Sequence, residues 1–227
     1  RYNIEIRTGT EAQGIVAAGK QWKIETKAGF IDTKSVLIAT GGFHKAEGYD
    51  WLARLGLQIV NPIPSLFTFN DSTKSFANLM GVSVPMAEVK IAGTKFSSRG
   101  AVLVTHWGLS GPAVIRLSAW AAEHLFKLNY IFTALVNWCG EPEEVVRNYC
   151  TALKAQGSQK KIVGHPLFGV PKRLWEHLCN KAGVTESHAW AEVSNKIVNR
   201  LIEVVCACPF SIKGKTTFKE EFVTCGG

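Results

Sequence analysis

The sequence lacks the patterns that identify several common classes of protein. None of its 21 glycines lies two positions from another, so the G-x-G-x-x-G fingerprint of dinucleotide-binding folds occurs nowhere. No two of its six cysteines have the C-x-x-C spacing of zinc ribbons and thioredoxin-like sites. The longest mainly apolar stretch, residues 130–139, is about half the length that a membrane-spanning helix needs. These 227 residues therefore contain no complete pyrophosphate-binding motif, no thioredoxin-type site and no membrane-spanning segment.

The sequence also lacks an initiator methionine and an apolar leader, and it stops on a pair of glycines where a turn would lead onward. We therefore expect it to be a part of a longer protein. Its 227 residues suffice for one large domain or two small ones, and an apolar content of 46% is ordinary for a soluble globular protein.

The six cysteines lie in apolar or helical surroundings, which favours buried free thiols in a reducing, cytoplasmic compartment. Cys206 and Cys208 are separated by one residue and form the only close pair that could ligate a metal. Two thiols alone do not make a site, and we predict no bound metal.

The net charge is +8, and part of it is concentrated between residues 154 and 181, where six lysines and arginines face a single acidic residue, Glu176. Such a surface attracts phosphates. The segment has few aromatic residues for stacking on bases, only Phe168 and Trp175, so nucleic acid is not favoured as a partner. A solvated basic face is the preferred interpretation, and a face for an acidic partner or nucleic acid is the alternative.

The first 60 residues read as a β-meander followed by a buried strand. Short alternating segments surround Gly19 and Gly29. The apolar run from Val36 to Thr40 ends in two glycines, which is typical of a strand buried on both faces of a parallel sheet. A short helix over residues 49–56 should follow, ending at a glycine.

Residues 61–140 are mostly β in pattern, with apolar runs bounded by proline, glycine or asparagine, and they predict a β-barrel or a strongly curved sheet. One helix interrupts them. Pro112 suits its first turn. Its apolar stripe comprises Ile115, Ser118, Ala119, Ala122, Leu125 and Phe126.

Residues 141–208 become helical, and the chain returns to β over 209–227. Two of three amphipathic helices begin after Pro142 and Pro171 and end before Gly157 and Gly183, the usual asymmetry of helix ends. The third carries an apolar face of Trp190, Val193, Ile197, Leu201, Val204 and Val205. Three such helices form a small bundle. The predicted fold class is therefore α+β.

The segment "VTHWGLSGPAV", residues 104–114, gathers the residue types that catalysis uses. Gly108 and Gly111 permit unusual backbone angles, and Pro112 starts a helix whose free N–H groups can hold negative charge. His106 and Ser110 are the candidate catalytic residues beside it. A G-x-S-x-G hydrolase elbow is incomplete because Pro112 occupies the last glycine position. The alternative is that both side chains merely cap the helix.

Five stretches together resemble one family: "ATGG" at 39–42, "GYDWLARLG" at 48–56, "PIPSLFTF" at 62–69, "RGAVLVTHWGLSGPAVIRLS" at 99–118 and "FKEEFVTCGG" at 218–227. In this order they resemble the bacterial FAD-dependent flavoproteins labelled NAD(P)/FAD-dependent oxidoreductases, which include aminoacetone-oxidase-like enzymes. The resemblance covers essentially the whole chain.

The resemblance implies a partial FAD-binding α/β sheet with a large insert of β-barrel and helical bundle. By this likeness, the turn formed by Ala39, Thr40, Gly41 and Gly42 lies along the ADP part of FAD, and the backbone near Glu11 and Ala12 meets the adenine. The insert would cover the flavin and shape a pocket for a small-molecule substrate. The domains implied are residues 1–60, 61–140, 141–208 and 209–227.

Two departures from the family are visible. The opening G-x-G-x-x-G unit is missing, and the loop after Gly42 is shortened to "FHKAE". We therefore expect FAD in the full-length protein but none on this chain alone. The parent is expected to be an oxidoreductase that acts on a small organic molecule, and this part alone to be inactive. The alternative is a non-catalytic binding module that uses its basic helical face.

Overall fold

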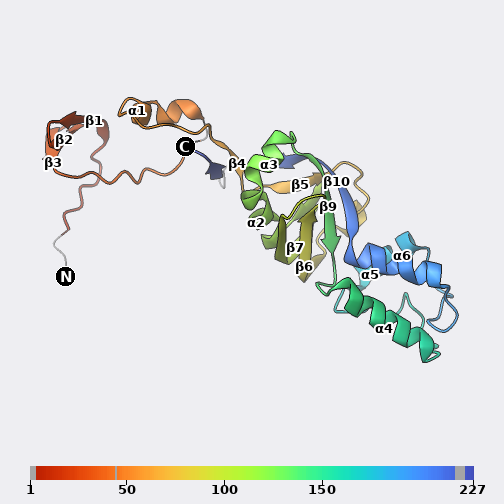
Figure 1. Cartoon of the computed structure of the whole chain (residues 1–227). Coiled ribbons are helices and arrows are strands. Elements are labelled where there is room, and N and C mark those ends of the chain that lie inside the picture. The colour runs from red at the N-terminus through yellow and green to blue at the C-terminus, as the bar shows by residue number, and fades with distance from the viewer. Residues whose placement is uncertain (1–3, 44, 218–222) are drawn as a thin grey trace. The chain divides into compact units, whose positions relative to one another are not determined.

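The computed structural model describes residues 4–43, 45–217 and 223–227, and its helices and strands are shown in Figure 1. The chain divides into two compact units: one contains Arg1–Ile63 and Thr224–Gly227, and the other contains Pro64–Val223. We call them the small unit and the barrel unit. Among the described residues, no helix is long and apolar enough to cross a membrane.

The small unit begins with an antiparallel three-stranded sheet, β1 (Ala12–Ala18), β2 (Gln21–Thr26) and β3 (Gly29–Thr33), in that order. The predicted meander is thus confirmed. A short 3₁₀ helix, η1 (Ala46–Tyr49), runs into one helical turn, α1 (Asp50–Ala53). Tyr49 is buried and its hydroxyl accepts a 2.8 Å hydrogen bond from the main-chain nitrogen of Phe43.

The strand expected over residues 36–40 is absent from the described structure. These residues belong to no strand, and Leu37 is 91% exposed. A strand buried on both faces needs hydrogen-bonded neighbours at its edges. None of the described strands pairs with this segment, and Val36 and Ile38 are only half-buried.

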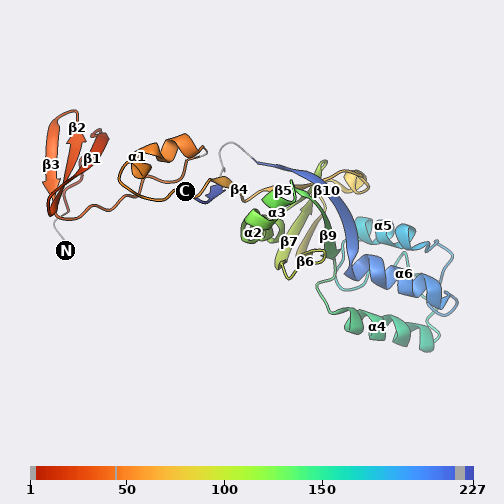
Figure 2. The ribbon, with the colours of Figure 1, turned by 45° about the horizontal axis from the view of Figure 1, so that its top comes forward.

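The barrel unit contains a closed six-stranded barrel in the order β10-β5-β8-β7-β6-β9, as predicted (Figures 1 and 2). Its strands are β5 (Thr68–Asp71), β6 (Ser83–Ile91), β7 (Ser97–Val104), β8 (Gly108–Ser110), β9 (Ile131–Asn137) and β10 (Cys208–Thr216). Closure leaves no free sheet edge in the barrel. A separate two-stranded sheet joins β4 (Ile63–Ser65) to β11 (Val223–Cys225).

The helix expected after Pro112 is two helices, α2 (Pro112–Trp120) and α3 (Ala122–Lys127). Of its predicted stripe, Ser118, Ala122 and Leu125 are buried, whereas Phe126 is 45% exposed. Val114 and Leu117, which the prediction left out, are fully buried. Ala121, with φ −101° and ψ 12°, lies between the two helices and interrupts the helical period on which the predicted stripe was based.

Three further helices lie together at one end of the barrel (Figure 2). They are α4 (Glu143–Ala155), α5 (Lys172–Ala182) and α6 (Asn195–Cys206). The ends predicted for α4 and α5 are confirmed, and Gly183 takes the left-handed conformation that ends α5. Ser194 begins α6 by accepting a hydrogen bond from the nitrogen of Ile197, so the buried Trp190 precedes the helix rather than lying on it.

The barrel and its helices share one apolar core that includes the fully buried Trp138, Trp175 and Trp190. The final long strand, β10, belongs to this barrel because it pairs with both β9 and β5. We expected residues 209–227 to form a return strand toward the nucleotide-binding part. The structure places Cys208–Thr216 in the barrel, residues 218–222 lie outside the described part, and Thr224–Gly227 belong to the small unit.

Candidate functional site

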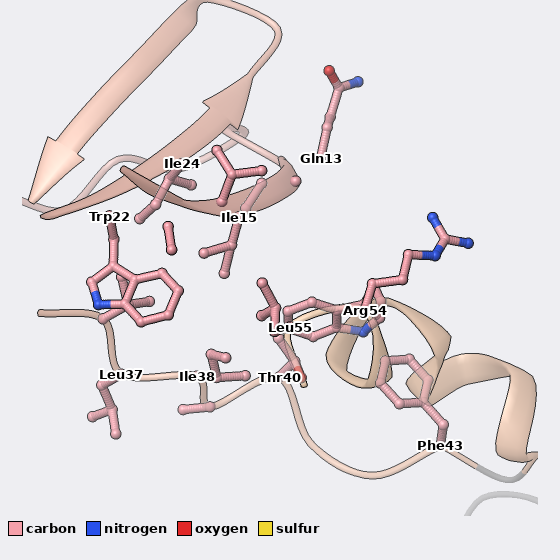
Figure 3. A pocket seen from close by; sticks show the side chains of 17 residues that line it. Gln13, Ile15, Trp22, Ile24, Leu37, Ile38, Thr40, Phe43, Arg54 and Leu55 are labelled. Atoms are coloured by element: carbon pink, nitrogen blue, oxygen red, sulfur yellow. The ribbon is translucent and has the colours of Figure 1, made fainter. Parts of the chain in front are cut away.

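The small unit contains a cavity of about 850 Å³ between its sheet and the extended segment 36–40 (Figure 3). Trp22, Ile15 and Ile24 line it from the sheet. Phe43 and Arg54 lie at the end opposite Trp22. The remaining lining residues are Ala12, Gln13, Gly14, Val16, Ala17, Val36, Leu37, Ile38, Ala39, Thr40, Trp51 and Leu55.

The cavity lies against one face of the sheet, to which Ile15, Ala17, Trp22 and Ile24 all belong, and it also adjoins the outer edge of β1. Residues 12–17 and 36–40 line it consecutively, whereas one face of a strand would contribute only alternate residues. Within the described part of the chain, β1 is an outer strand that pairs with β2 alone. Main-chain N–H and C=O groups of β1 on the side away from β2 are therefore available to a ligand in this cavity.

Three of the six residues predicted to bind the cofactor meet here: Ala12, Ala39 and Thr40. The other three, Glu11, Gly41 and Gly42, do not line the cavity. The Glu11 carboxylate is exposed and lies 3.4 Å from the amino group of Lys27.

The turn after Thr40 nevertheless favours glycine at both of its positions, 41 and 42. Gly41 has a φ of +79°, in the left-handed region that favours glycine. A side chain at Gly42 would contact Thr224 Oγ1 at 3.3 Å and the hydroxyl of Tyr49 at 3.4 Å. The turn therefore permits the chain to leave the cavity and approach the rest of the small unit closely.

Sequence reasoning missed three prominent residues of the cavity: Trp22, Trp51 and Arg54. Both tryptophans are only half-buried. Arg54 is the only cationic side chain among the lining residues, and no ion pair to it occurs in the described part of the chain. The "GYDWLARLG" stretch contains both Trp51 and Arg54, so it was the available signal.

The chemistry of the cavity suits the adenosine end of a dinucleotide. Unpaired main-chain groups can hydrogen-bond the edge of a base, and aromatic and aliphatic side chains can cover its faces. A diphosphate requires a glycine-rich turn at a helix N-terminus, which this sequence does not contain. The described residues therefore fit adenosine and do not supply a cradle for the phosphates.

The two predicted catalytic residues lie in the barrel unit, on the hairpin of β7 and β8. Ser110 pairs with Leu103 in the ladder, and His106 lies in the connecting loop. The hydroxyl of Thr105 donates to the carbonyl of Gly108 at 3.1 Å and accepts from its nitrogen at the same distance. The loop is thus closed on itself, and the ring of His106 is exposed.

Neither residue caps the following helix, which excludes the capping alternative for α2. Gly111, with a φ of +99°, is the N-cap residue of α2, and no side chain makes a capping hydrogen bond to this helix. The ring of His106 contacts Trp107 edge-on, with centroids 4.2 Å apart. Neither His106 nor Ser110 lines a cavity described for the barrel unit.

Two lysines of the predicted basic segment are hydrogen-bonded to uncharged groups of the protein. The amino group of Lys161 donates to the carbonyl of Ser187 at 2.6 Å, and Lys154 bonds the side chain of Asn195. Lys172 and Arg173, by contrast, lie on the exposed side of α5. Arg173 also lines a groove beside α5, whereas Lys172 is not among its lining residues.

Both thiols of the Cys206–Cys208 pair favour the protonated form. Cys208 is fully buried, and burial raises the pKa of its thiol to about 11. A hydrogen bond with Cys139 raises the pKa of Cys206 far above its usual range, which also disfavours the thiolate that a metal requires. Across residues 4–43, 45–217 and 223–227, no three histidine, cysteine or acidic side chains gather as a metal would need.

Comparison with known proteins identifies similar sequences over most of the chain. The family model described as "HI0933-like protein barrel and H2TH domain" matches residues 63–223. The "Ribosomal RNA dihydrouridine synthase" of Haemophilus influenzae is 26% identical over 204 residues, which are 86% of this chain and 47% of that protein. The protein of the same name from Escherichia coli is 22% identical over 235 residues, 99% of this chain and 56% of its own length. The chain spans about half the length of these curated relatives.

Proposed function

Because the chain belongs to the family of HI0933-like proteins with a barrel and H2TH domain, within the FAD-dependent oxidoreductase superfamily, we propose that it is part of a flavoprotein that reduces uridine in ribosomal RNA. In this proposal the small unit holds the adenosine end of FAD. The barrel unit supplies the surface that meets the RNA.

The observation that carries the flavin part is the single cavity lined by Ala12, Ala39 and Thr40. These residues come from segments about 27 positions apart, and the flavoprotein resemblance assigns both to the adenosine end of FAD. The main chain of β1 would bond the adenine edge, and Trp22 and Ile38 would cover the base. Arg54 is the residue of the cavity best suited to a phosphate.

The substrate class comes from the names of the relatives. Both are ribosomal RNA dihydrouridine synthases, whereas the sequence alone favoured a small organic substrate. The net charge of +8 supports RNA, because a cationic protein is drawn to the phosphate backbone. The proposal depends on the FAD-dependent superfamily and on the two relatives, and not on a likeness to aminoacetone-oxidase-like enzymes.

Conversion of uridine to dihydrouridine adds a hydride and a proton across the C5–C6 double bond of the base. Reduced FAD is the usual source of such a hydride. The protein must therefore hold the base and provide a proton donor. His106 and Ser110 remain our candidates for contacting the substrate, since the ring of His106 is exposed and no hydrogen bond to the Ser110 hydroxyl is recorded among the described residues.

The test is to delete the gene that contains this sequence in its source organism, digest the ribosomal RNA and measure its nucleosides by mass spectrometry. The proposal expects dihydrouridine to disappear from one position and to return when the gene is restored. Unchanged dihydrouridine in the deletion strain would contradict the proposal.

A second candidate function is a binding module without redox chemistry, supported by the exposed cations of α5. The absorption spectrum of the full-length gene product distinguishes the two functions. A bound flavin absorbs visible light and favours the oxidoreductase, whereas a colourless protein that still binds RNA favours the module.

A further inference from the structure

A polar groove of about 300 Å³ lies on the barrel unit, between the 3₁₀ helix η2 (Ala77–Leu79) and α5. Its lining residues are Asn78, Leu79, Arg173, Glu176, His177 and Asn180. Residues 78–79 and residues 173–180 lie far apart in the sequence. Only the fold brings these two segments together.

The groove has a fixed wall at Arg173. Its guanidinium donates a 2.8 Å hydrogen bond to the main-chain carbonyl of Asn78, across 95 positions of sequence. A guanidinium has several N–H donors, so this bond leaves others for a ligand. Arg173 is therefore held in place while part of its hydrogen-bonding capacity remains open.

The floor of the groove is formed by packed rings and an aliphatic side chain. The His177 ring lies 4.5 Å from the ring of Phe76, centroid to centroid, and Leu79 is buried. Burial, with a smaller contribution from Lys181, lowers the pKa of His177, which favours a neutral ring at neutral pH. No hydrogen bond to its buried Nε2 occurs in the described part of the chain.

The charges around the groove are mixed rather than uniformly positive. Lys172 and Arg173 are exposed at the start of α5, and Lys181 lies near its end with its amino group 5.4 Å from the centre of the Phe76 ring. Glu176 lies between them, and its carboxylate is 3.9 Å from the amino group of Lys172, on the exposed side of the helix. A site for phosphate alone would be weakened by this carboxylate.

A carboxylate and an amide beside cations match the chemistry of a nucleotide better than that of a phosphate. A carboxylate accepts hydrogen bonds from the exocyclic amino group of a base. Asn180 supplies both a donor and an acceptor beside it. Proteins read RNA sequence mainly at unpaired bases, which present such edges and a face for packing.

We infer that the groove between η2 and α5 binds one unpaired nucleotide of RNA. A base with an exocyclic amino group faces Glu176 and Asn180, and the adjoining phosphates lie on Lys172 and Arg173. This inference rests on the proposed function, because it takes RNA as the substrate class.

The experiment measures binding of the 227-residue chain to short fluorescein-labelled oligocytidylate and oligouridylate by fluorescence anisotropy over a range of salt concentrations. Cytidine has an exocyclic amino group and uridine has none. The variants are Arg173→Ala and Glu176→Gln. The controls are Arg200→Ala and Glu203→Gln, because Arg200 and Glu203 form an exposed ion pair with the same spacing on α6.

Arg173→Ala should weaken binding of both oligonucleotides by about five- to thirty-fold and reduce the salt slope by about one, as expected for a lost phosphate contact. Glu176→Gln should lower the ratio of oligocytidylate to oligouridylate affinity. The two α6 variants should leave this ratio unchanged and have a smaller effect on affinity.

If Arg173→Ala and Arg200→Ala lower oligonucleotide affinity equally, the groove is not the nucleotide-binding site. The proposed function would be unaffected by that result. Absence of salt-dependent binding by the unaltered chain would overturn both the groove and the RNA part of the proposed function. If the gene deletion leaves dihydrouridine unchanged while Arg173→Ala still weakens binding more than Arg200→Ala does, the proposed function fails and the groove stands. Equal displacement of both oligonucleotides by polyglutamate would assign the surface to an acidic protein instead.

Discussion

The main-chain nitrogen of Phe67 donates a 2.8 Å hydrogen bond to Ser118 Oγ, and that hydroxyl donates to the carbonyl of Ile115 at 2.7 Å. Ser118 is fully buried and joins α2 to the chain between β4 and β5. The motif "LSGPAVIRLS" thus has two serines with different surroundings. Ser118 satisfies buried main-chain groups. In the described part of the chain, the Ser110 hydroxyl makes no hydrogen bond of this kind.

Replacing Ser118 with alanine should destabilise the barrel unit by about 1–3 kcal/mol, because the buried N–H of Phe67 loses its acceptor. Urea unfolding followed by circular dichroism measures the change. Ser110→Ala is the matched control and should shift the unfolding free energy by less than about 0.5 kcal/mol. A Ser118→Ala variant as stable as the unaltered chain would contradict this role.

His106→Ala and Ser110→Ala in the full-length gene product should reduce dihydrouridine formation while leaving the melting temperature unchanged. Neither side chain caps α2, so their removal costs no helix stability. The assay is the nucleoside measurement described above, with melting followed in parallel. Loss of several degrees with normal activity per folded molecule would assign both residues a structural role.

The 227-residue chain alone should be colourless after purification, because it lacks the glycine-rich turn and helix that hold the diphosphate of FAD. Absorption spectra before and after gel filtration test this. Flavin that remains with the chain in equal molar amount would show that the described residues suffice to hold the whole cofactor.

Filling the cavity of the small unit should prevent adenosine binding. Ala39→Leu places a larger side chain among the lining residues and should abolish binding of AMP by the chain, followed by nuclear magnetic resonance shifts. Ala28→Leu makes the same exchange at an exposed position outside the cavity and serves as the control. Equal AMP binding by both variants would place the nucleotide elsewhere.

Alkaline pH should destabilise the barrel unit through Cys179. Burial, with a smaller effect of Glu176, raises the pKa of this thiol from an ordinary value of 9.0 to about 12. The folded protein therefore retains a proton that the unfolded chain releases, and the stability that this proton contributes is lost as the pH rises above 9.0.

Unfolding by urea at pH values of about 8 and about 10 measures this loss. Cys179→Ala should lose less stability between the two than the unaltered chain. Val184→Ala, which removes a buried apolar group without a proton, should lower stability at both and retain the original pH dependence. An identical pH dependence in Cys179→Ala would exclude the thiol as its source.

Local patterns in the sequence predicted much of the barrel unit. Pro142 and Pro171 mark the starts of α4 and α5, and Gly157 and Gly183 follow their ends, because the fixed φ of proline and the left-handed conformation of glycine act within a few residues. Alternating apolar runs likewise predicted the barrel strands. The cofactor and catalytic residues remain predictions, although Ala12, Ala39 and Thr40 line one cavity.

Contacts between distant segments were decided only by the tertiary structure. The apolar run from Val36 to Thr40 reads as a strand, but strand formation depends on hydrogen-bonded neighbours, and no described strand provides them. The sequence likewise determined the strand character of Cys208–Thr216 without its place, which follows from pairing with β9 and β5. The bond from Arg173 to Asn78 spans 95 positions. Periodicity reports only which face of an element is apolar, whereas such a bond depends on how the closed barrel packs against α5.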